Sequence, residues 1–244
     1  MKRIVILGAT STMIQPLLRR MAADGKELLL VARSQERLDA VRSDLRARGA
    51  ANVLTFEADL TASPDLVYSF AEQCFCDFDT LLLSYGTMLD QGLCQADVEF
   101  AARELQTNLI SAVVLLTVFA RHFEQRRSGV IAGITSVAGD RGRRSNYVYG
   151  AAKGGLSIFL QGLRNRMCQY GVRVLTIKPG PVVTAMTADE SNMPMIADSE
   201  KVARDIYDAL ESSNSDVIYT PRQWRWIMAM LKLVPERLFK RLPI

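Results

Sequence analysis

Short apolar runs recur along the chain, and segments of helical length separate them. The runs lie at residues 3–7, 27–32, 52–57, 80–84, 129–134 and 172–178. Most are continuous rather than alternating, which is typical of strands buried on both faces of a sheet. The alternation of strand and helix predicts a parallel sheet with right-handed crossovers and helices on both faces.

The segments between the runs have the spacing of amphipathic helices. Apolar residues recur at intervals of three and four in 13–22, 36–48 and 64–74. Another helix is expected at 200–212 and a last strand at 216–220. We therefore predict an α/β fold of the Rossmann type, a doubly wound and mostly parallel sheet of about seven strands. Ligands of such sheets lie beyond the carboxyl ends of the strands.

The length and composition of the chain favour one domain. A chain of 244 residues that is 49% hydrophobic suits a single globular unit over 1–220, followed by a basic, amphipathic helical extension over 221–244. The start, "MKRIVILGA", resembles a signal peptide, but its apolar run is six residues long and meets polar residues at once. No apolar stretch approaches the roughly 18 residues of a membrane-spanning helix. A cytoplasmic protein is expected.

The net charge of +4 is unevenly distributed. Residues 222–244 hold six Lys or Arg and one acid, whereas the rest has 24 basic and 25 acidic residues. A nucleic-acid surface would need basic residues spread over the body, so no nucleic-acid partner is expected.

The cysteines and the single histidine do not predict a metal site. Cys74, Cys76, Cys94 and Cys168 show no paired C-x-x-C spacing, and His122 alone leaves zinc-type ligand sets incomplete. We expect reduced structural thiols, a surface histidine and no metal.

Two residues in "YVYGAAKGG" have the spacing of a proton-transfer pair. Tyr149 and Lys153 are four residues apart, which places both on one helical face. A phenol has a pKa of about 10, and a nearby ammonium group lowers it. By itself this spacing also fits a solvated helix face.

Ser136 stands thirteen residues before Tyr149, directly after the apolar run at 129–134. Its hydroxyl could donate a hydrogen bond to a substrate carbonyl, where charge changes during hydride transfer. The alternative is an ordinary Ser/Thr turn.

At these residues the chain resembles the classical short-chain dehydrogenase/reductase family. The family's Ser, Tyr-x-x-x-Lys and preceding helical Asn match Ser136, Tyr149, Lys153 and Asn108, and the resemblance covers essentially residues 1–220. It implies an enzyme that interconverts a ketone and a secondary alcohol with NAD(P). Tyr149 would exchange the proton, Lys153 would lower its pKa and hold the ribose, Ser136 would orient the carbonyl, and Asn108 would hold a water of the proton relay.

The same resemblance assigns a cofactor site. The segment "KPGPVVT" at 178–184 matches the family's turn near the nicotinamide, and Asp59 lies where the family binds adenine. The cofactor-binding residues implied are Gly8, Thr10, Ser11, Thr12, Met13, Arg33, Asp59, Leu60, Gly86, Tyr149, Lys153, Pro179, Gly180, Val182 and Thr184.

The end of the second strand bears on cofactor choice. An acid there would bind the ribose 2′-hydroxyl, whereas an Arg accommodates a 2′-phosphate. The chain has Arg33 at this place, so NADP(H) is predicted over NAD(H). The alternative is that Arg33 is a solvated residue ahead of a helix cap at Ser34.

Two glycine motifs of the family are altered. The first turn reads "GATSTMI", with Thr12 and Ile14 in place of glycines, and "LSYG" at 83–86 keeps only the final Gly86 of the Asn-Asn-Ala-Gly motif. Backbone N–H groups and the helix dipole still favour a phosphate at the first turn. The rival is a catalytically silent member that senses the dinucleotide or binds a protein. Such a relative would be expected to lose the Tyr or the Lys first, and both are present.

The extension at 221–244 leaves two interpretations open. Trp224, Ile227, Met228, Leu231 and Val234 form one helical stripe, and Trp226, Met230 and Leu233 widen it. With its basic residues, this helix could lie on the inner face of a membrane, which favours a lipid-linked carbonyl substrate. It could equally pack over the cleft or in a homodimer or homotetramer, which leaves the small-molecule substrate open. The methionines of 185–199 suit an apolar substrate, or fill gaps in a core.

Overall fold

The computed structural model describes residues 1–183, 196–211 and 215–242. Its seven strands are β1 (Arg3–Leu7), β2 (Glu27–Ala32), β3 (Asn52–Glu57), β4 (Thr80–Leu83), β5 (Val130–Ile134), β6 (Arg173–Pro179) and β7 (Val217–Thr220). They form one sheet in the order β3-β2-β1-β4-β5-β6-β7, and every neighbouring pair is parallel. The predicted Rossmann-type, doubly wound sheet is therefore confirmed.

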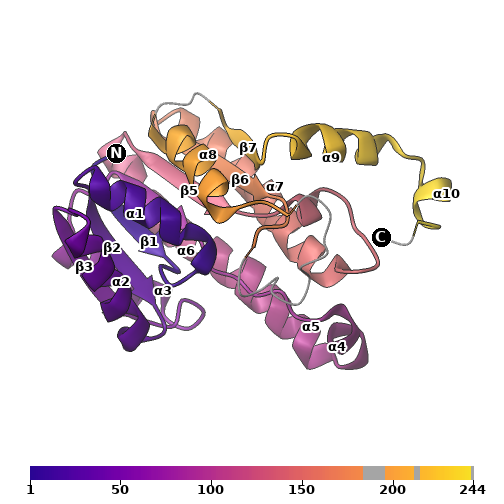
Figure 1. Cartoon of the computed structure of the whole chain (residues 1–244), viewed down its shortest axis with the longest axis horizontal. Coiled ribbons are helices and arrows are strands. Elements are labelled where there is room, and N and C mark those ends of the chain that lie inside the picture. Colours follow the sequence, from indigo (N-terminus) through magenta and orange to yellow (C-terminus); the bar gives the residue numbers. More distant parts are fainter. Residues whose placement is uncertain (184–195, 212–214, 243–244) are drawn as a thin grey trace.

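Helices cover both faces of this sheet (Figure 1). In chain order they are η1 (Thr12–Ile14), α1 (Gln15–Ala23), α2 (Gln35–Ala47), α3 (Pro64–Cys74), α4 (Gln91–Ala96), α5 (Val98–Leu105), η2 (Gln106–Ile110), α6 (Ser111–Arg126), η3 (Val137–Asp140), α7 (Tyr147–Cys168), α8 (Ser199–Glu211), α9 (Trp224–Leu233) and α10 (Glu236–Phe239). One hydrophobic core lies under α1, α2 and α8, and the other lies under α3, α6 and α7.

The central strands supply both cores at once. In β1, Ile4 and Ile6 belong to the core under α1, whereas Val5 and Leu7 belong to the core under α6. All four side chains are fully buried. Because alternate side chains of a strand point to opposite faces, a strand covered on both sides is apolar at every position. This explains the continuous apolar runs of the sequence.

The run from α5 through η2 to α6 corrects one expectation. Val98–Arg126 is a 29-residue helical segment that is long and apolar enough to cross a membrane. The sequence analysis expected no such stretch. In the fold, Leu115, Phe119 and Phe123 of α6 are fully buried in the core. Its apolarity is accounted for by the sheet on which it packs.

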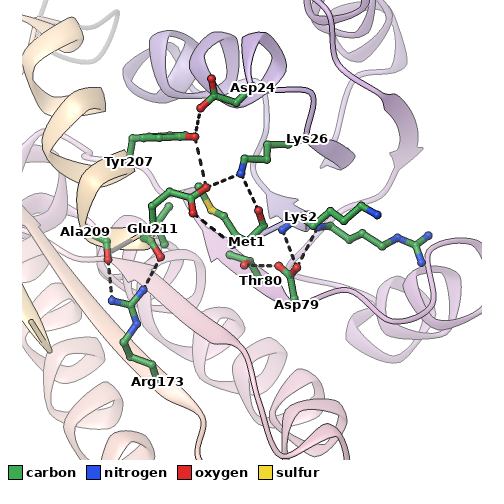
Figure 2. Close-up of polar contacts among 12 residues, drawn as sticks. Met1, Lys2, Asp24, Lys26, Asp79, Thr80, Arg173, Tyr207, Ala209 and Glu211 are labelled. Carbon is green, nitrogen blue, oxygen red and sulfur yellow. Dashed lines mark hydrogen bonds and ion pairs between the residues drawn. The ribbon is translucent and has the colours of Figure 1, made fainter. Parts of the chain in front are cut away.

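The amino ends of the strands are linked by a polar network (Figure 2). Lys26 Nζ donates to Met1 O at 2.8 Å and to Glu211 Oε1 at 2.5 Å, which joins β2 to the end of α8. The Lys2 amide donates to Asp79 Oδ2 at 2.7 Å. Arg173, the first residue of β6, donates to the last carbonyls of α8, Ala209 O at 2.8 Å and Leu210 O at 2.6 Å. This edge of the sheet is closed by its own side chains.

Candidate active site at the carboxyl ends of the strands

A cleft of about 530 Å³ lies at the opposite edge, beyond the carboxyl ends of the strands. Sixteen of the residues assigned from the sequence line this one cleft: Gly8, Thr10, Ser11, Thr12, Met13, Arg33, Asp59, Leu60, Gly86, Asn108, Ser136, Tyr149, Lys153, Pro179, Gly180 and Val182. Thr184 and most of the loop at 185–199 lie outside the described residues. Volume and position fit a ligand site in a doubly wound sheet.

The altered first turn keeps a tight backbone at Gly8. Gly8 has a φ of +93°, and a Cβ added there would lie 2.6–2.9 Å from Tyr85 Cβ, N and Cα. Only glycine fits this position without strain. The turn is braced by Gln15, whose Nε2 donates to Ala9 O at 2.8 Å and Ser11 O at 3.0 Å. Gln15 was not singled out from the sequence.

The turn departs from the family pattern at Thr12 and Ile14. Thr12 lies at the cleft and Ile14 lies in the core. Thr12 begins the short helix η1 and lines the cleft, so the start of this helix lies at the cavity. Ile14 is fully buried in the core under α1, where its side chain takes the space between helix and sheet. The anion-binding backbone of a helix start is thus retained without the two glycines.

Two arginines line the end of the cleft beside β2. Arg33 is exposed, and Arg37 Nη2 donates to Thr10 O at 3.0 Å, so the Arg37 guanidinium lies at the first turn. Ser34 caps α2 by accepting from the Arg37 amide at 3.3 Å. Hydrogen bonds from Thr61 hold the pKa of Asp59 below its usual value, and the Arg33 charge adds to this. Arg37 is the residue here that sequence reasoning missed.

Gly86 brings Asn108 close to Lys153. A Cβ at Gly86 would lie 2.4 Å from Asn108 Oδ1 and 3.1 Å from Lys153 Nζ. Asn108 lies in the π-helical turn η2 and is buried, and its Oδ1 accepts from the Thr87 amide at 3.2 Å. The single glycine kept from the family's motif is therefore the one at which a side chain would collide with two assigned site residues.

Tyr149 and Lys153 extend from the first two turns of α7. Lys153 is buried, and its Nζ lies 5.8 Å from the centroid of the Tyr149 ring and 3.4 Å from Ile134 O. Burial raises the pKa of Tyr149 to about 12, a hydrogen bond with Ser136 opposes this, and the Glu104 carboxylate raises it further. Burial lowers the pKa of Lys153 to about 8, and Glu104 opposes that shift.

These values correct one expectation. The sequence predicted that the Lys153 ammonium would lower the Tyr149 pKa, whereas the pKa is raised. The reason is that desolvation by burial, together with the Glu104 carboxylate, outweighs the hydrogen bond with Ser136. Tyr149 therefore carries its proton at neutral pH.

Glu104 is a buried acid that the sequence analysis did not identify. It is fully buried on α5, one turn before Asn108, and its Oε1 accepts from Asn108 Nδ2 at 2.9 Å. Its Oε2 accepts from Thr87 Oγ1 at 2.8 Å and from the Leu89 amide at 3.3 Å. Burial raises the pKa of Glu104, and these hydrogen bonds and the Lys153 charge oppose the rise. The available signal was an acid four residues before the predicted Asn.

Trp224 of α9 lines the cleft beside the turn after β6. A Cβ at Gly180 would lie 2.0 Å from Trp224 Nε1, so the indole rests directly on the glycine. Trp224 is 6% exposed and packs with Val137 of η3 and Met228. Pro179, Gly180 and Val182 line the cleft at this end. The start of the C-terminal extension is thus part of the candidate site.

The extension is two helices rather than one, since Pro235 separates α9 from α10. The stripe predicted from the sequence packs inward, because Trp224 and Met228 are buried and Ile227, Leu231 and Val234 are half-buried. The residues that widen the stripe are exposed: Trp226 by 71%, Met230 by 67% and Leu233 by 77%. Figure 1 shows α9 and α10 at the periphery, away from β3.

Side chains of the turn after β5 hold the two helices in place. Arg141 Nη2 pairs with Glu236 Oε2 at 3.1 Å, and its guanidinium lies 3.6 Å from the centroid of the Phe239 ring. Asp140 accepts from Tyr219 at 2.7 Å and pairs with Lys232 Nζ at 3.3 Å. One apolar face of the extension is therefore packed on the domain and the other faces outward.

The surface histidine expected from the sequence is wrong. His122 is 8% exposed, stacks on Phe78 and has hydrogen bonds from both ring nitrogens, to Glu72 Oε1 at 2.6 Å and to Phe78 O at 2.9 Å. Its position on the core side of α6 explains the burial. All four cysteines are free; Cys94 is buried and the other three are exposed. Among the described residues, no group of His, Cys, Asp or Glu could hold a metal ion.

Comparisons with known proteins agree with this fold. The sequence model of the short chain dehydrogenase family matches residues 2–194. An uncharacterized oxidoreductase of Mycobacterium tuberculosis is 35% identical over 243 residues, which cover 98% of this chain and 96% of the relative. Another uncharacterized oxidoreductase, from Streptomyces coelicolor, is 29% identical and covers 100% of this chain and 96% of the relative. The chain belongs to the short-chain dehydrogenase/reductase family and is an oxidoreductase of the class that acts on CH–OH and C=O groups with NAD(P).

Solved structures share the fold. A short chain dehydrogenase from Burkholderia cenocepacia, solved with NADP, superposes with a TM-score of 0.84 at 21% identity and covers 100% of this chain and 98% of its own. A short-chain dehydrogenase from Sphingobium yanoikuyae, solved with NADPH, has a TM-score of 0.82 at 23% identity and covers 97% of each chain.

Proposed function

We propose that the protein interconverts a ketone and a secondary alcohol by hydride transfer with NADP(H). The observation that carries the proposal is one cleft that joins the first turn at Gly8 to Ser136, Tyr149 and Lys153. A dinucleotide site and a proton-transfer pair, half-buried Tyr149 and buried Lys153, in the same cavity are the two parts that this reaction needs.

The residues around the first turn suit the dinucleotide. The start of η1 and the space kept by Gly8 fit a pyrophosphate, and Asp59 fits the adenosine end. The nicotinamide ring supplies or accepts the hydride when it is bound. Gly180 and Val182 would hold that end of the cofactor, next to Tyr149.

The protein's own residues would handle the proton. Tyr149, with its pKa raised to about 12, holds a proton at neutral pH and gives it to the carbonyl oxygen during reduction. Ser136 donates a hydrogen bond to the same oxygen, and Lys153 stabilises the phenolate that is left. Asn108 would hold a water of the proton relay.

NADP(H) is proposed over NAD(H) because Arg33 and Arg37 both line the cleft beside β2. Two guanidinium groups favour a 2′-phosphate, and no described acid after β2 takes the place of a ribose-binding carboxylate. Two of the solved structures with this fold contain NADP or NADPH.

Calorimetric titration with NADPH and NADH tests the cofactor site, and NADPH consumption with a panel of ketones tests the reaction. We expect NADPH to bind at least about tenfold more tightly than NADH, and Arg33→Gln to remove most of that ratio. Glu36→Gln, an exposed neighbour on α2, is the matched control. Binding of neither cofactor would refute the enzyme and leave the silent, protein-binding member as the alternative.

The outward face of the extension supports a proposal on location. Trp226, Met230 and Leu233 are exposed beside Arg225 and Lys232, which suits a cytoplasmic protein bound to an anionic membrane surface. Such a position favours a lipid-linked carbonyl substrate. The protein should sediment with phosphatidylglycerol vesicles. Trp226→Ser should abolish this sedimentation, whereas Ile158→Ser, on the exposed face of α7, should leave it unchanged. If a homodimer or homotetramer buries this face instead, the Trp226→Ser variant should form a smaller oligomer in solution than the wild type.

A further inference from the structure

Three of the buried polar atoms without a hydrogen-bond partner belong to residues that line the cleft. In the described part of the chain the buried atoms without such a partner are Arg3 Nε, Gln91 Nε2, Arg143 Nε, Asn146 Oδ1 and Trp224 Nε1. Arg3 Nε has an ionic partner, because it lies 3.4 Å from Glu27 Oε2. Arg143, Asn146 and Trp224 all line the cleft. A buried polar atom that is left unpaired costs free energy, so three of them around one cavity indicate a ligand that would pair them.

The charge of Arg143 is uncompensated. Burial alone lowers the pKa of its guanidinium, and no described carboxylate acts on it. The only acid among the described residues of the cleft is Asp59, which lies within the influence of Arg33 at the adenosine end. A half-buried arginine without an acid beside it favours an anionic group in the cavity, because the pair would offset the cost of desolvating the charge.

The start of α7 adds to this positive potential. The helix is 22 residues long and begins at Tyr147, its N-cap residue Asn146 makes no side-chain cap, and its first turn holds no acid. The positive end of a long helix dipole is therefore not neutralised by the protein itself. Arg143 lies in the turn that leads into this helix, where the Asn146 amide donates to Arg143 O at 3.2 Å.

We propose that Arg143, Asn146 and Trp224 form a subsite for an oxyanion group of the substrate, a phosphate ester or a carboxylate. Arg143 and the Trp224 indole N–H donate to the oxyanion, and Asn146 Oδ1 accepts from a neighbouring hydroxyl group. The substrate class is a hydroxylated carbonyl compound with an oxyanion group at a distance from the reacting carbon. The subsite rests on the proposed function for the carbonyl end, but anion binding is measurable without turnover.

Matched ketone pairs test the substrate class. With NADPH, dihydroxyacetone phosphate and 4-oxopentanoate should be reduced with a higher kcat/KM than dihydroxyacetone and methyl 4-oxopentanoate. Arg143→Gln should lower kcat/KM for the charged members, mainly through KM, at least about tenfold more than for the neutral members. Arg144→Gln is the control, since Arg144 is exposed and adjacent but does not line the cleft. The phosphate and carboxylate pairs show which oxyanion fits.

Binding of inorganic phosphate tests the subsite independently of catalysis. The titration is done with saturating NADP, which occupies any anion site at Arg33. Phosphate should then quench the Trp224 fluorescence, and Arg143→Gln should weaken the affinity for phosphate at least about tenfold. A quench that persists in Trp226→Phe identifies Trp224 as the reporting indole, since Trp226 is the other tryptophan of the chain. Equal phosphate binding by Arg143→Gln and Arg144→Gln, or none by the wild type, would overturn the subsite even if neutral ketones are reduced. Phosphate binding lost in Arg143→Gln would support it even if no tested ketone is reduced.

Discussion

The two edges of the sheet differ in whether their polar side chains have partners within the protein. At the amino edge, charged side chains are paired with one another and with helix ends, as in Lys26 with Glu211 and Arg173 with the last carbonyls of α8 (Figure 2). At the carboxyl edge, Arg143, Asn146 and Trp224 keep buried atoms without partners, and Lys153 is enclosed with Tyr149.

This contrast separates residues that stabilise the fold from residues that are kept for a ligand. A paired edge lowers the free energy of the folded state, whereas unpaired groups cost free energy that only binding recovers. Substitutions at the amino edge should therefore change stability without changing catalysis. Substitutions at the carboxyl edge should do the reverse, except where the backbone itself is constrained.

The largest effect is expected for Tyr149→Phe at the carboxyl edge. Loss of the proton donor should lower kcat by about 10²- to 10⁴-fold, while NADPH affinity stays within about twofold. The free energy of unfolding should change by no more than about 1 kcal/mol, the contribution of the lost hydrogen bond with Ser136. Turnover and urea unfolding measured on the same preparation check this. Retention of turnover in Tyr149→Phe would mean that another group transfers the proton.

Gly8→Ala should lower both stability and cofactor affinity, because at this position the backbone that forms the site is also part of the fold. The added Cβ would meet the Tyr85 backbone at 2.7 Å, and the φ of +93° is strained for alanine. We expect a loss of about 2 kcal/mol or more of unfolding free energy together with most of the cofactor affinity. The control is Gly25→Ala, with a φ of +65° but nothing within 4 Å of the added Cβ. Equal losses in the two variants would show that strain alone, and not the contact with Tyr85, sets the effect.

The same division explains what sequence patterns could predict. The strands, the doubly wound sheet and the residues around the cleft followed from apolar runs and from a family pattern with fixed spacings. Glu104, Arg143 and Trp224 did not, because their significance lies in the absence or identity of partners that are distant in the chain. His122 was misjudged for the same reason, since the groups that bury it, Glu72 and Phe78, come from other elements.

Glu104→Gln should produce a smaller change, seen as a displaced pH profile. The Glu104 carboxylate raises the pKa values of both Tyr149 and Lys153, so its neutralisation should lower both. In alcohol oxidation, which needs the phenolate, the acidic limb of kcat/KM should move to lower pH. Glu99→Gln on the exposed face of α5 is the control. A lower rate with an unmoved limb would restrict Glu104 to holding Asn108 in place.

The smallest effect is expected for Lys26→Met at the amino edge. Lys26 and the N-terminal amino group hold the pKa of Glu211 below its usual value against the opposing effect of burial. A lowered folded-state pKa stabilises the protein above the unfolded pKa of about 4.5, and this stability is lost as the pH falls through the folded value. Removal of Lys26 should therefore cost about 0.5–1 kcal/mol at pH 7 and less at pH 3, with kcat/KM unchanged. Urea unfolding at the two pH values measures the difference. A cost that is the same at both pH values would assign the loss to packing of the Lys26 chain, and a fall in kcat/KM would show that the two edges are coupled through β2.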